Sequence, residues 1–305
     1  MYLFSVIVPV YNGENFIGRC IESMQRQNCK DWECIFVDDG STDDSYEILS
    51  NYNKHDCRIK VIHQENRGAA LARVSGIKAA HGDFLIFVDI DDTLEPDALT
   101  DIADIIDRAP EVDIVVFGMN ILKGRHVRKR RVQVTSNDRV SYLKSVMSGR
   151  NGLEMWGKAF KSHLFTPMPE VADNVRIGED AAFFFQLALR SNCIIYDERA
   201  HYNYIQQESS ASKVKSNKLA EETMDAAFFI EDKLRQAPCY TQISDYIAPM
   251  FLLFFSNSTR RGRLQKNSRY CQKISECISF RALIKLPLYK SVYILLRYLL
   301  LITAN

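Results

Sequence analysis

Short apolar runs alternate with amphipathic stretches over the first 120 residues of the chain. The runs are rich in β-branched and aromatic residues and lie at residues 4–10, 32–37, 59–63, 84–89 and 113–119. Helical spacing of apolar residues appears between them, at residues 14–27, 43–52, 67–80 and 96–109. Such alternation is typical of βαβ units. It predicts an α/β fold with a mostly parallel sheet and helices on both faces.

The pattern changes in the second half of the chain. Residues 141–147 and 180–190 have helical spacing, and the sequence after Lys218 is helical in pattern apart from breaks near Pro238 and Pro287. The basic stretch at residues 123–131 is more typical of an exposed hairpin or loop than of a binding patch. We therefore expect an α/β domain at residues 1–215 and a helical C-terminal region at residues 216–305.

Polar residues follow four of the predicted strands, at the point where each strand ends. They are Tyr11, Asn12 and Gly13; Asp38, Asp39, Gly40, Ser41 and Thr42; Glu65, Asn66, Arg67 and Gly68; and Asp89, Asp91 and Asp92. Ligands of open α/β sheets bind in the crevice outside the carboxyl ends of the strands. The four strand ends therefore predict one ligand-binding rim.

The acids after the fourth strand have two interpretations. Residues two apart on a strand share a face, so Asp89 and Asp91 can point the same way. Close carboxylates need a compensating positive charge, and a hard divalent cation with oxygen ligands is the obvious candidate for holding a phosphorylated substrate. Alternatively the acids are solvated and cap the next helix, with Thr93 as N-cap and Pro96 in the first turn.

The other rim residues also have two interpretations each. An aromatic ring at Tyr11 can stack on a nucleobase, or the segment is an ordinary turn. One carboxylate of the Asp38–Asp39 pair can accept a hydrogen bond from a base or ribose, or Ser41 and Asp44 form a capping box. Arg67 or Arg73 can bind phosphate at a helix N-terminus, or each can pair with nearby acids.

Composition narrows the class of protein. The chain is 47% hydrophobic and 25% charged with a net charge of +1, which argues against disorder and against a nucleic-acid partner. Ten basic residues and one acid, Glu276, lie in residues 258–305, which gives that segment a net charge of +9. The eight cysteines form no C-x-x-C pair, so we expect neither structural zinc nor a redox motif. Most cysteines lie in apolar or helical contexts as small core residues, so we expect a reducing cytoplasmic setting. We also expect no signal peptide and no transmembrane helix.

Taken in order, the motifs of residues 4–205 resemble the family 2 glycosyltransferases with the GT-A fold. The resemblance rests on Pro9 and Tyr11 of the first strand, Asp38-Asp39-Gly40-Ser41, Asn66-Arg67-Gly68 with Ala72-Arg73, Asp89-Ile90-Asp91-Asp92, and Glu179-Asp180. The family often has asparagine after the Ala-Arg pair, where this chain has Val74, so no amide role is carried over to that position. The resemblance implies a GT-A domain that binds a nucleotide-sugar.

The resemblance also implies roles for individual residues. Asp89 and Asp91 would hold a Mn or Mg ion and the donor diphosphate, Asp180 of the Glu179-Asp180 pair would be the catalytic base, and Trp156 and Asp92 would lie on the acceptor side. A mobile loop over the diphosphate matches Ser210, Ser212 and Lys213 loosely. The implied donor-binding residues are Pro9, Tyr11, Asn12, Asp38, Asp39, Asn66, Arg73, Asp89 and Asp91.

These roles imply an inverting transfer. The acceptor is expected to be a glycan or a lipid-linked molecule of surface polysaccharide biosynthesis, and the donor a UDP-sugar. One base and direct displacement give inversion at the anomeric carbon, and the sequence offers no nucleophile for retention.

Two other classes of protein remain open on the sequence. Residues 88–94 also resemble the nucleophile motif of haloacid dehalogenase-type phosphatases, with Asp89 as nucleophile and Asp91 as general acid, although that motif usually follows the first strand. The second alternative is a non-catalytic nucleotide-binding protein on a membrane surface.

The C-terminal helix motivates the membrane interpretation. Leu288, Val292, Leu295, Leu299 and Ile302 recur at helical spacing, with Lys290 and Arg297 on a narrow polar side. A basic amphipathic helix of this kind can lie on the inner face of an anionic membrane as a peripheral anchor. Alternatively it packs on the body of the protein with its charges in solvent.

Overall fold

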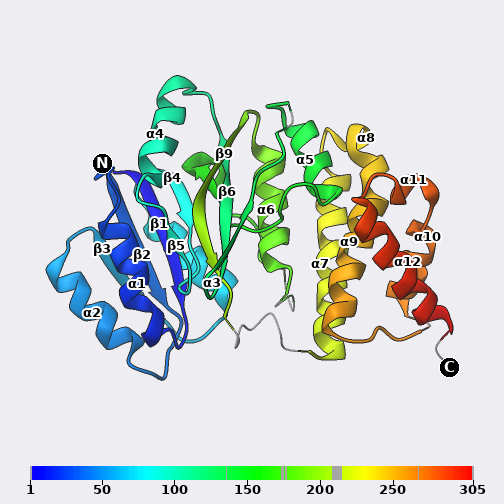
Figure 1. The fold of residues 1–305 in the computed structure, drawn as a ribbon, viewed down its shortest axis with the longest axis horizontal. Helices are drawn as coiled ribbons and strands as arrows, with labels where there is room; N and C mark the ends of the chain where they lie inside the picture. Colours follow the sequence, from blue (N-terminus) through cyan, green and yellow to red (C-terminus); the bar gives the residue numbers. More distant parts are fainter. Residues whose placement is uncertain are drawn as a thin grey trace. The chain divides into compact units, whose positions relative to one another are not determined.

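The computed structural model describes residues 2–134, 136–172, 175, 177–207, 215–266 and 268–303 (Figure 1). Its contacts divide the chain into two compact units. The first consists of Met1–Val134, Met155–Pro169 and Ser191–Gln207, and the second of Thr135–Glu154, Glu170–Arg190 and Glu208–Asn305. The units interleave along the chain, whereas the predicted domains meet at 215/216. The predicted domain boundary at residues 215/216 therefore stays a prediction.

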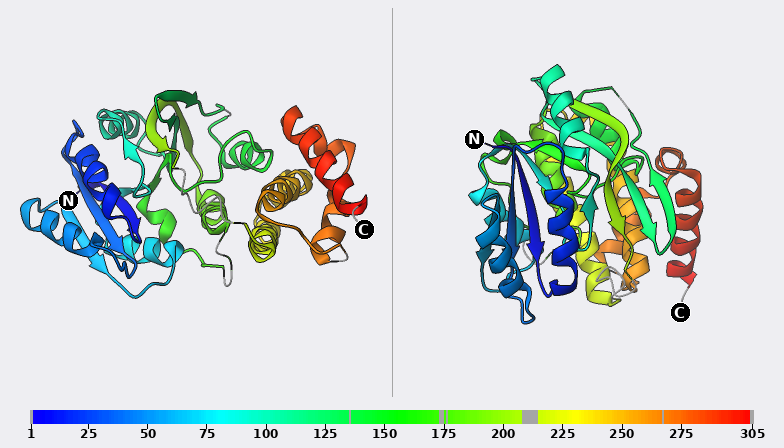
Figure 2. Two further views of the ribbon diagram at one scale, coloured as in Figure 1. Left: turned by 60° about the horizontal axis from the view of Figure 1, so that its bottom comes forward. Right: turned by 60° about the vertical axis from the view of Figure 1, so that its left-hand side comes forward.

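The first unit is built on one mixed sheet (Figures 1 and 2). Its path of hydrogen-bonded strands is β3-β2-β1-β4-β8-β6-β9-β5, with β7 pairing β6. The strands are β1 Tyr2–Val10, β2 Trp32–Asp38, β3 Ile59–His63, β4 Gly82–Phe87, β5 Thr93–Leu94, β6 Ile114–Lys123, β7 His126–Arg130, β8 Lys158–Lys161 and β9 Ile194–Ile205. Strands β1 to β4 are parallel, as predicted, and β8 runs antiparallel to β4 and β6.

Helices cover both faces of the parallel part, as the sequence predicts. They are α1 Glu14–Gln25, α2 Ser45–His55, α3 Ala69–Ala79 and α4 Ala98–Arg108. Alternate residues of β2 separate into two apolar clusters: Cys34 and Phe36 belong to the cluster that includes α1 residues, whereas Ile35 and Val37 pack with Ala72 of α3. Neighbouring strand residues point to opposite faces, so this division follows directly from the pleat. A side chain at Gly76 would bring its Cβ within 2.5 Å of Ile7, so glycine lets α3 lie close to β1.

Two details of the predicted elements are wrong. The fourth strand ends at Phe87, so Asp89 and Asp91 lie beyond the strand and not along its face. Thr93 is not a helix cap, because Thr93–Leu94 pair with β9 as β5 and helix α4 begins after Asp97. The basic stretch forms the exposed hairpin β6–β7, whose turn contains Gly124 at φ +56°.

The second unit is helical. Its elements are α5 Arg139–Met147, α6 Glu179–Arg190, α7 Asn217–Arg235, α8 Tyr240–Ile243, a 3-10 turn at Ser244–Tyr246, α9 Ile247–Arg261, α10 Arg269–Cys277, α11 Phe280–Leu283 and α12 Leu288–Thr303. Buried residues of α7 and α9, among them Met224, Ile230 and Phe251, form its interior. None of the described helices is both long and apolar enough to cross a membrane.

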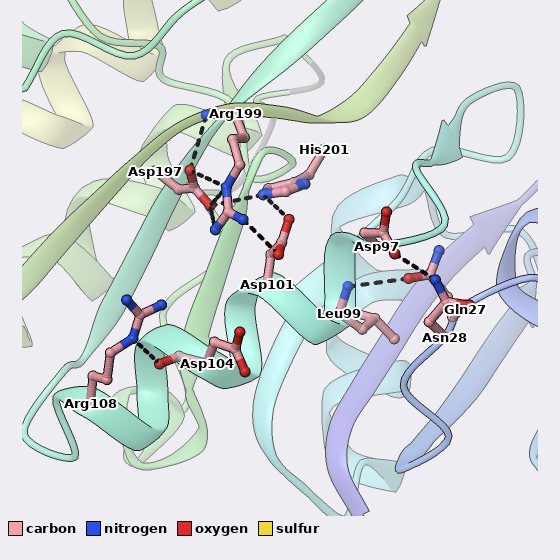
Figure 3. Close-up of polar contacts among 10 residues, drawn as sticks. All are labelled: Gln27, Asn28, Asp97, Leu99, Asp101, Asp104, Arg108, Asp197, Arg199 and His201. Carbon is pink, nitrogen blue, oxygen red and sulfur yellow. Dashed lines mark hydrogen bonds and ion pairs between the residues drawn. The ribbon is translucent and has the colours of Figure 1, made fainter.

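A cluster of charged side chains joins α4 to β9 (Figure 3). Asp197 accepts hydrogen bonds from the Arg199 side chain, the shortest at 2.8 Å, and pairs with His201 Nε2 at 2.8 Å. Arg199 and His201 also face Asp101 of α4, at 2.6 Å and 3.7 Å. Burial alone would raise the pKa of Asp197, but the bonds from His201 and Arg199 lower it overall. The cluster therefore fixes the segment of β9 that leads into Tyr202.

Asp197→Asn is expected to lower the free energy of unfolding at pH 7 by about 2 kcal/mol, because charge-assisted hydrogen bonds are lost. The folded-state pKa of Asp197 lies below its unfolded value, so its contribution is present above pH of about 3.9 and is lost as pH falls through the folded pKa. Urea unfolding measured from neutral to acid pH should therefore show that the difference in unfolding free energy between the wild type and the variant becomes smaller. Asp104→Asn, at an exposed position on α4, is the matched control. A difference in unfolding free energy that stays constant with pH would contradict the ionic role of Asp197.

Candidate functional site

The ends of β1 and β2 are joined by hydrogen bonds between their loops. Asp39 N–H donates to the Val10 carbonyl over 2.8 Å, directly after both strands. Asn12 adopts φ +50°, and its N–H donates to Ser41 Oγ at 3.0 Å. Its side-chain oxygen accepts from Thr42 N–H at 2.8 Å. The two loops therefore form one rigid edge, and Asn12 is a structural part of it.

Asp39 connects this edge to the loop after β3. Its carboxylate is almost fully buried and accepts bonds from Gln64 Nε2 at 2.7 Å, Arg67 N–H at 2.9 Å and Gly68 N–H at 2.7 Å. Gly68 lies at φ +88° and Gly40 at φ +70°, a region that favours glycine. The capping-box interpretation is wrong here: α2 begins after Asp44, and Ser41 Oγ binds the Asn12 N–H.

Asp38 and three aromatic rings complete this part of the rim. Asp38 is buried, and its Oδ2 lies 2.6 Å from Nδ1 of His63 at the end of β3. The His63 ring contacts Tyr46 with centroids 4.7 Å apart. Tyr11 is 53% exposed, so its ring is open to a flat ligand. Pro9 pairs in register with Val37, one residue before the strand end.

The acids after β4 lie in a turn closed by a bond from Asp92 N–H to the Asp89 carbonyl at 2.9 Å. Two cations accompany the turn. Arg73 of α3 is buried and lies 3.3 Å from Asp89 Oδ1, and Arg19 of α1 donates to the Asp91 carbonyl at 2.6 Å. Burial raises the pKa of the Asp91 carboxyl. A carboxylate desolvated in this way gains more from a nearby cation than a solvated one does.

Asp92 is fully buried and holds the turn from beneath. Its two oxygens accept from the Tyr202 hydroxyl at 2.7 Å and from Ile205 N–H at 2.8 Å. Tyr202 accepts in turn from Asp89 N–H at 3.1 Å. Burial raises the pKa of Asp92 to about 8. The interpretation of three solvated acids is therefore wrong for Asp92, and its predicted acceptor contact stays a prediction.

Trp156 extends this network. Its ring stacks on Tyr202, with centroids 4.9 Å apart and planes 15° apart. It also stacks on Tyr204, at 5.6 Å and 10°. Trp156 is half-buried, so part of the stack faces solvent. An aromatic surface of this kind suits the apolar face of a sugar ring, and the acceptor role of Trp156 stays a prediction.

Glu179 and Asp180 open helix α6 in the second unit, directly after Gly178 at φ +90°. Acids in a first helical turn are favoured by the helix dipole, so the position alone is also compatible with a structural role. The roles of Glu179 and Asp180 stay predictions. Ser210, Ser212 and Lys213 lie outside the described residues.

Asp89 and Asp91 offer hard oxygen ligands beside a cluster of donors suited to phosphate. Within the described part of the chain, no group of three or more His, Cys, Asp and Glu side chains could hold a metal ion by itself. Mg²⁺ commonly binds through one or two carboxylates plus substrate phosphates. Two carboxylates of this kind fit a cation that binds together with a diphosphate.

Three residues of the rim were missed by the sequence reasoning. Tyr202 lies 110 residues after Asp92 in the chain, and Arg19 and His63 carry no motif. Only the fold brings Tyr202 and Arg19 to the strand ends, whereas His63 already ends the predicted third strand. A period-two pattern in β9, with Tyr202 and Tyr204 on one face, was the one available indication.

Comparison with known proteins identifies the family to which this chain belongs. The chain belongs to glycosyl transferase family 2, whose family model matches residues 5–169. It is 32% identical over 233 residues to the glycosyltransferase GlyA of Streptococcus pneumoniae. The aligned region covers 73% of this chain and 33% of GlyA. The chain spans no more than 60% of two Bacillus subtilis relatives. The haloacid dehalogenase interpretation is therefore wrong, as the late position of the motif on β4 also indicates.

Solved structures share the fold. The fragment 1–349 of Staphylococcus aureus TarS in complex with UDP superposes with a TM-score of 0.72 at 22% identity, covering 99% of this chain and 90% of that one. The mannosyltransferase PcManGT of Pyrobaculum calidifontis, in complex with GDP-Man and Mn²⁺, gives a TM-score of 0.56 at 15% identity, covering 97% and 87%. At these identities the likeness establishes the GT-A fold alone.

Proposed function

We propose that the chain transfers a sugar from a UDP-sugar to an acceptor hydroxyl, with inversion at the anomeric carbon. The observation that carries the proposal is the linked rim: Asp39 binds the loop before α3, and Arg73 of α3 pairs with Asp89 after β4. A TarS fragment has been solved with UDP and with UDP-GlcNAc, which supports this donor class.

The donor would lie along the rim. Tyr11 would stack on the base, and Asp39 would accept its N–H, with Asp38 and Asn12 holding the loops in place. Pro9 and Asn66 would line the same edge. Arg73 would orient Asp89 toward the ribose and diphosphate. These roles are supported by the family resemblance and by the positions of the residues at strand ends or, for Asn66 and Arg73, in the loop after β3 and in helix α3.

Asp89 and Asp91 would hold a divalent cation with the diphosphate, and PcManGT solved with Mn²⁺ supports this assignment. Such an ion neutralises the charge that develops on the leaving diphosphate. The choice between Mn²⁺ and Mg²⁺ is open to the experiment below.

Asp180 would act as the general base, with Glu179 beside it. Its carboxylate would accept the proton of the acceptor hydroxyl as that oxygen bonds to the anomeric carbon. The bond from the anomeric carbon to the diphosphate oxygen breaks in the same step, and its electron pair leaves with UDP. A single displacement inverts the configuration.

The acceptor would be a glycan or a lipid-linked glycan of surface polysaccharide biosynthesis. TarS is a poly(ribitol-phosphate) β-N-acetylglucosaminyltransferase that is 28% identical over 206 residues, which supports a polymer acceptor. Trp156 would contact the acceptor, and Asp92 would support that side of the site. We also propose a cytoplasmic protein with peripheral contact to the inner membrane face through the C-terminal region.

A nucleotide panel tests the proposal. UDP and UDP-sugars with Mn²⁺ or Mg²⁺ should raise Tm by about 4 °C at saturating concentration. A ligand present at 100 times its Kd stabilises the native state by about 2.7 kcal/mol, and the unfolding entropy is about 2.1 cal/mol/K per residue. Addition of EDTA should remove most of the shift. Equal shifts with GDP and dTDP would contradict the UDP assignment. Donor binding without sugar transfer to any glycan or lipid-linked acceptor would favour the non-catalytic alternative.

A further inference from the structure

Helix α12 packs on its own unit through the side that carries Ser291 and Ile294, and not through its leucines. Ile294 is fully buried and Ser291 nearly so, and both belong to the side that faces α9. Lys290 Nζ donates to the Gly149 carbonyl at 3.0 Å. Arg297 Nε donates to the Tyr293 hydroxyl at 2.9 Å. The charged residues of α12 are therefore engaged by the protein.

The opposite side of α12 is apolar and exposed (Figures 1 and 2, red). It has no charged residue, and we call it the leucine face. Its exposed fractions are Leu288 80%, Tyr289 70%, Val292 50%, Leu295 38%, Leu296 57%, Leu299 52% and Leu300 60%. The side chain of Ile302 lies outside the described residues.

The structure corrects how the two sides of this helix were assigned from the sequence, and the membrane interpretation stays a prediction. Lys290 and Arg297 are half-buried: Lys290 bonds to the Gly149 carbonyl, and Arg297 bonds to Tyr293 of the same helix. The leucines that were expected to pack on the body face outward. Local periodicity identified an amphipathic helix, but could not say which side the body of the unit would occupy.

The short helix α11 and the residue that follows it also expose large apolar side chains. Phe280 is 79% exposed and Ile284 is 61% exposed, and both adjoin the exposed cation Arg281. Proteins rarely leave apolar surface of this extent in water, and such patches mark contact with a partner or a membrane. The face therefore needs an apolar partner.

Charge decides between the partners. Residues 258–305 carry ten basic residues and one acid. Three of these cations already pair with acids outside the segment: Arg269 with Asp225, Lys273 with Glu231 and Lys285 with Asp245. In a two-fold dimer through the leucine face, each copy would still bring exposed cations such as Arg281 against the same surface of its partner. An anionic bilayer surface would instead attract these exposed cations. The composition therefore favours a lipid surface over a second copy.

We propose that the leucine face inserts into the interfacial layer of an anionic bilayer, with α12 lying in the membrane plane. The helix has 16 residues and is about 24 Å long, which suits an in-plane position. Insertion would rest on the leucines, while Arg281 and the other exposed cations add attraction to anionic headgroups. The inference deepens the proposed membrane contact and rests on it, but is independent of catalysis.

Vesicle co-sedimentation of the full chain tests the inference. Phosphatidylcholine vesicles with phosphatidylglycerol should pellet the protein, and the double variant Leu295→Gln/Leu299→Gln should lower its partition coefficient at least about tenfold, since less apolar surface leaves water. Val127→Gln/Val134→Gln, at exposed valines of the first unit, is the matched control and should bind as the wild type does. Arg281→Gln should weaken binding to anionic vesicles alone.

The contradicting outcomes are distinct. A wild-type protein that stays in the supernatant with phosphatidylcholine vesicles, both with and without phosphatidylglycerol, contradicts the membrane contact. A double variant that binds as the wild type does contradicts insertion of the leucine face. Sedimentation velocity that shows a wild-type dimer, dissociated by the double variant and without vesicle binding, assigns the face to a second copy. A UDP-induced rise in Tm that is unchanged in the double variant shows that the variant is folded and keeps the donor site separate from this result.

Discussion

Asp180→Asn is expected to lower kcat by about 10³-fold while leaving the binding of UDP and its sugars unchanged. Asparagine keeps the shape of the side chain but cannot accept the hydroxyl proton, and a positioned general base typically contributes about 10²–10⁴-fold. Because the loss lies in a step after donor binding, the nucleotide-induced rise in Tm should persist. Single-turnover transfer and thermal shift together separate the two effects.

Asp232→Asn is the matched control for that substitution. Asp232 is an exposed carboxylate on α7 of the same helical unit, and its side chain bonds to Gln236. Its replacement should leave both measurements unchanged. Full transfer activity in Asp180→Asn would assign the Glu179-Asp180 pair to the structural role that its place in a first helical turn also permits, and the base would have to be sought elsewhere.

Asp91→Ala is expected to abolish metal-dependent nucleotide binding and, with it, measurable transfer. Asp91 is a half-buried carboxylate whose pKa is raised by burial, so it gains strongly from a cation. Without it the diphosphate would face Asp89 and Arg73, which already pair with each other at 3.3 Å. The rise in Tm that UDP produces with Mn²⁺ should fall to the level seen with EDTA.

The matched control for Asp91→Ala is a substitution in β4, the strand that precedes the acidic turn. Asp83 is an exposed acid at the opposite end of β4, and Asp83→Ala removes the same charge far from the rim. It should leave nucleotide binding intact. If Asp91→Ala also retains a Mn²⁺-dependent shift equal to that of the wild type, the cation is held elsewhere and the assignment of the Asp-x-Asp pair to the metal is wrong.

The rim was predictable because its parts are local. Each strand ends within a few residues of a Gly, Asn or Asp cluster, and parallel strands bring their carboxyl ends to one edge. Asp39, Asp89 and Arg73 could therefore be grouped from the sequence. Asp39 accepts hydrogen bonds from the Arg67 and Gly68 N–H groups before α3, and Arg73 pairs with Asp89, so the loops after β2, β3 and β4 are linked.

Long-range partners were not predictable in the same way. Tyr202 supports both Asp92 and the Asp89 backbone from more than a hundred residues away, and nothing near it in the sequence indicates that pairing. The burial of Asp92 was missed for the same reason. An acid next to two partly exposed acids looks solvated until its hydrogen-bond donors are known.

The sequence by itself determined the α/β pattern, the order of the strand-end motifs and hence the family, because periodicity and turn chemistry act over a few residues. Only the tertiary structure decided which acid is buried, which cations lie beside the others, and which side of α12 faces outward. Those outcomes depend on contacts between segments far apart in the chain. A helix with an apolar and a charged side can place either side against the body of its unit. Here Lys290 bonds to the Gly149 carbonyl of that unit, Arg297 bonds to Tyr293 of its own helix, and the leucine face is left exposed.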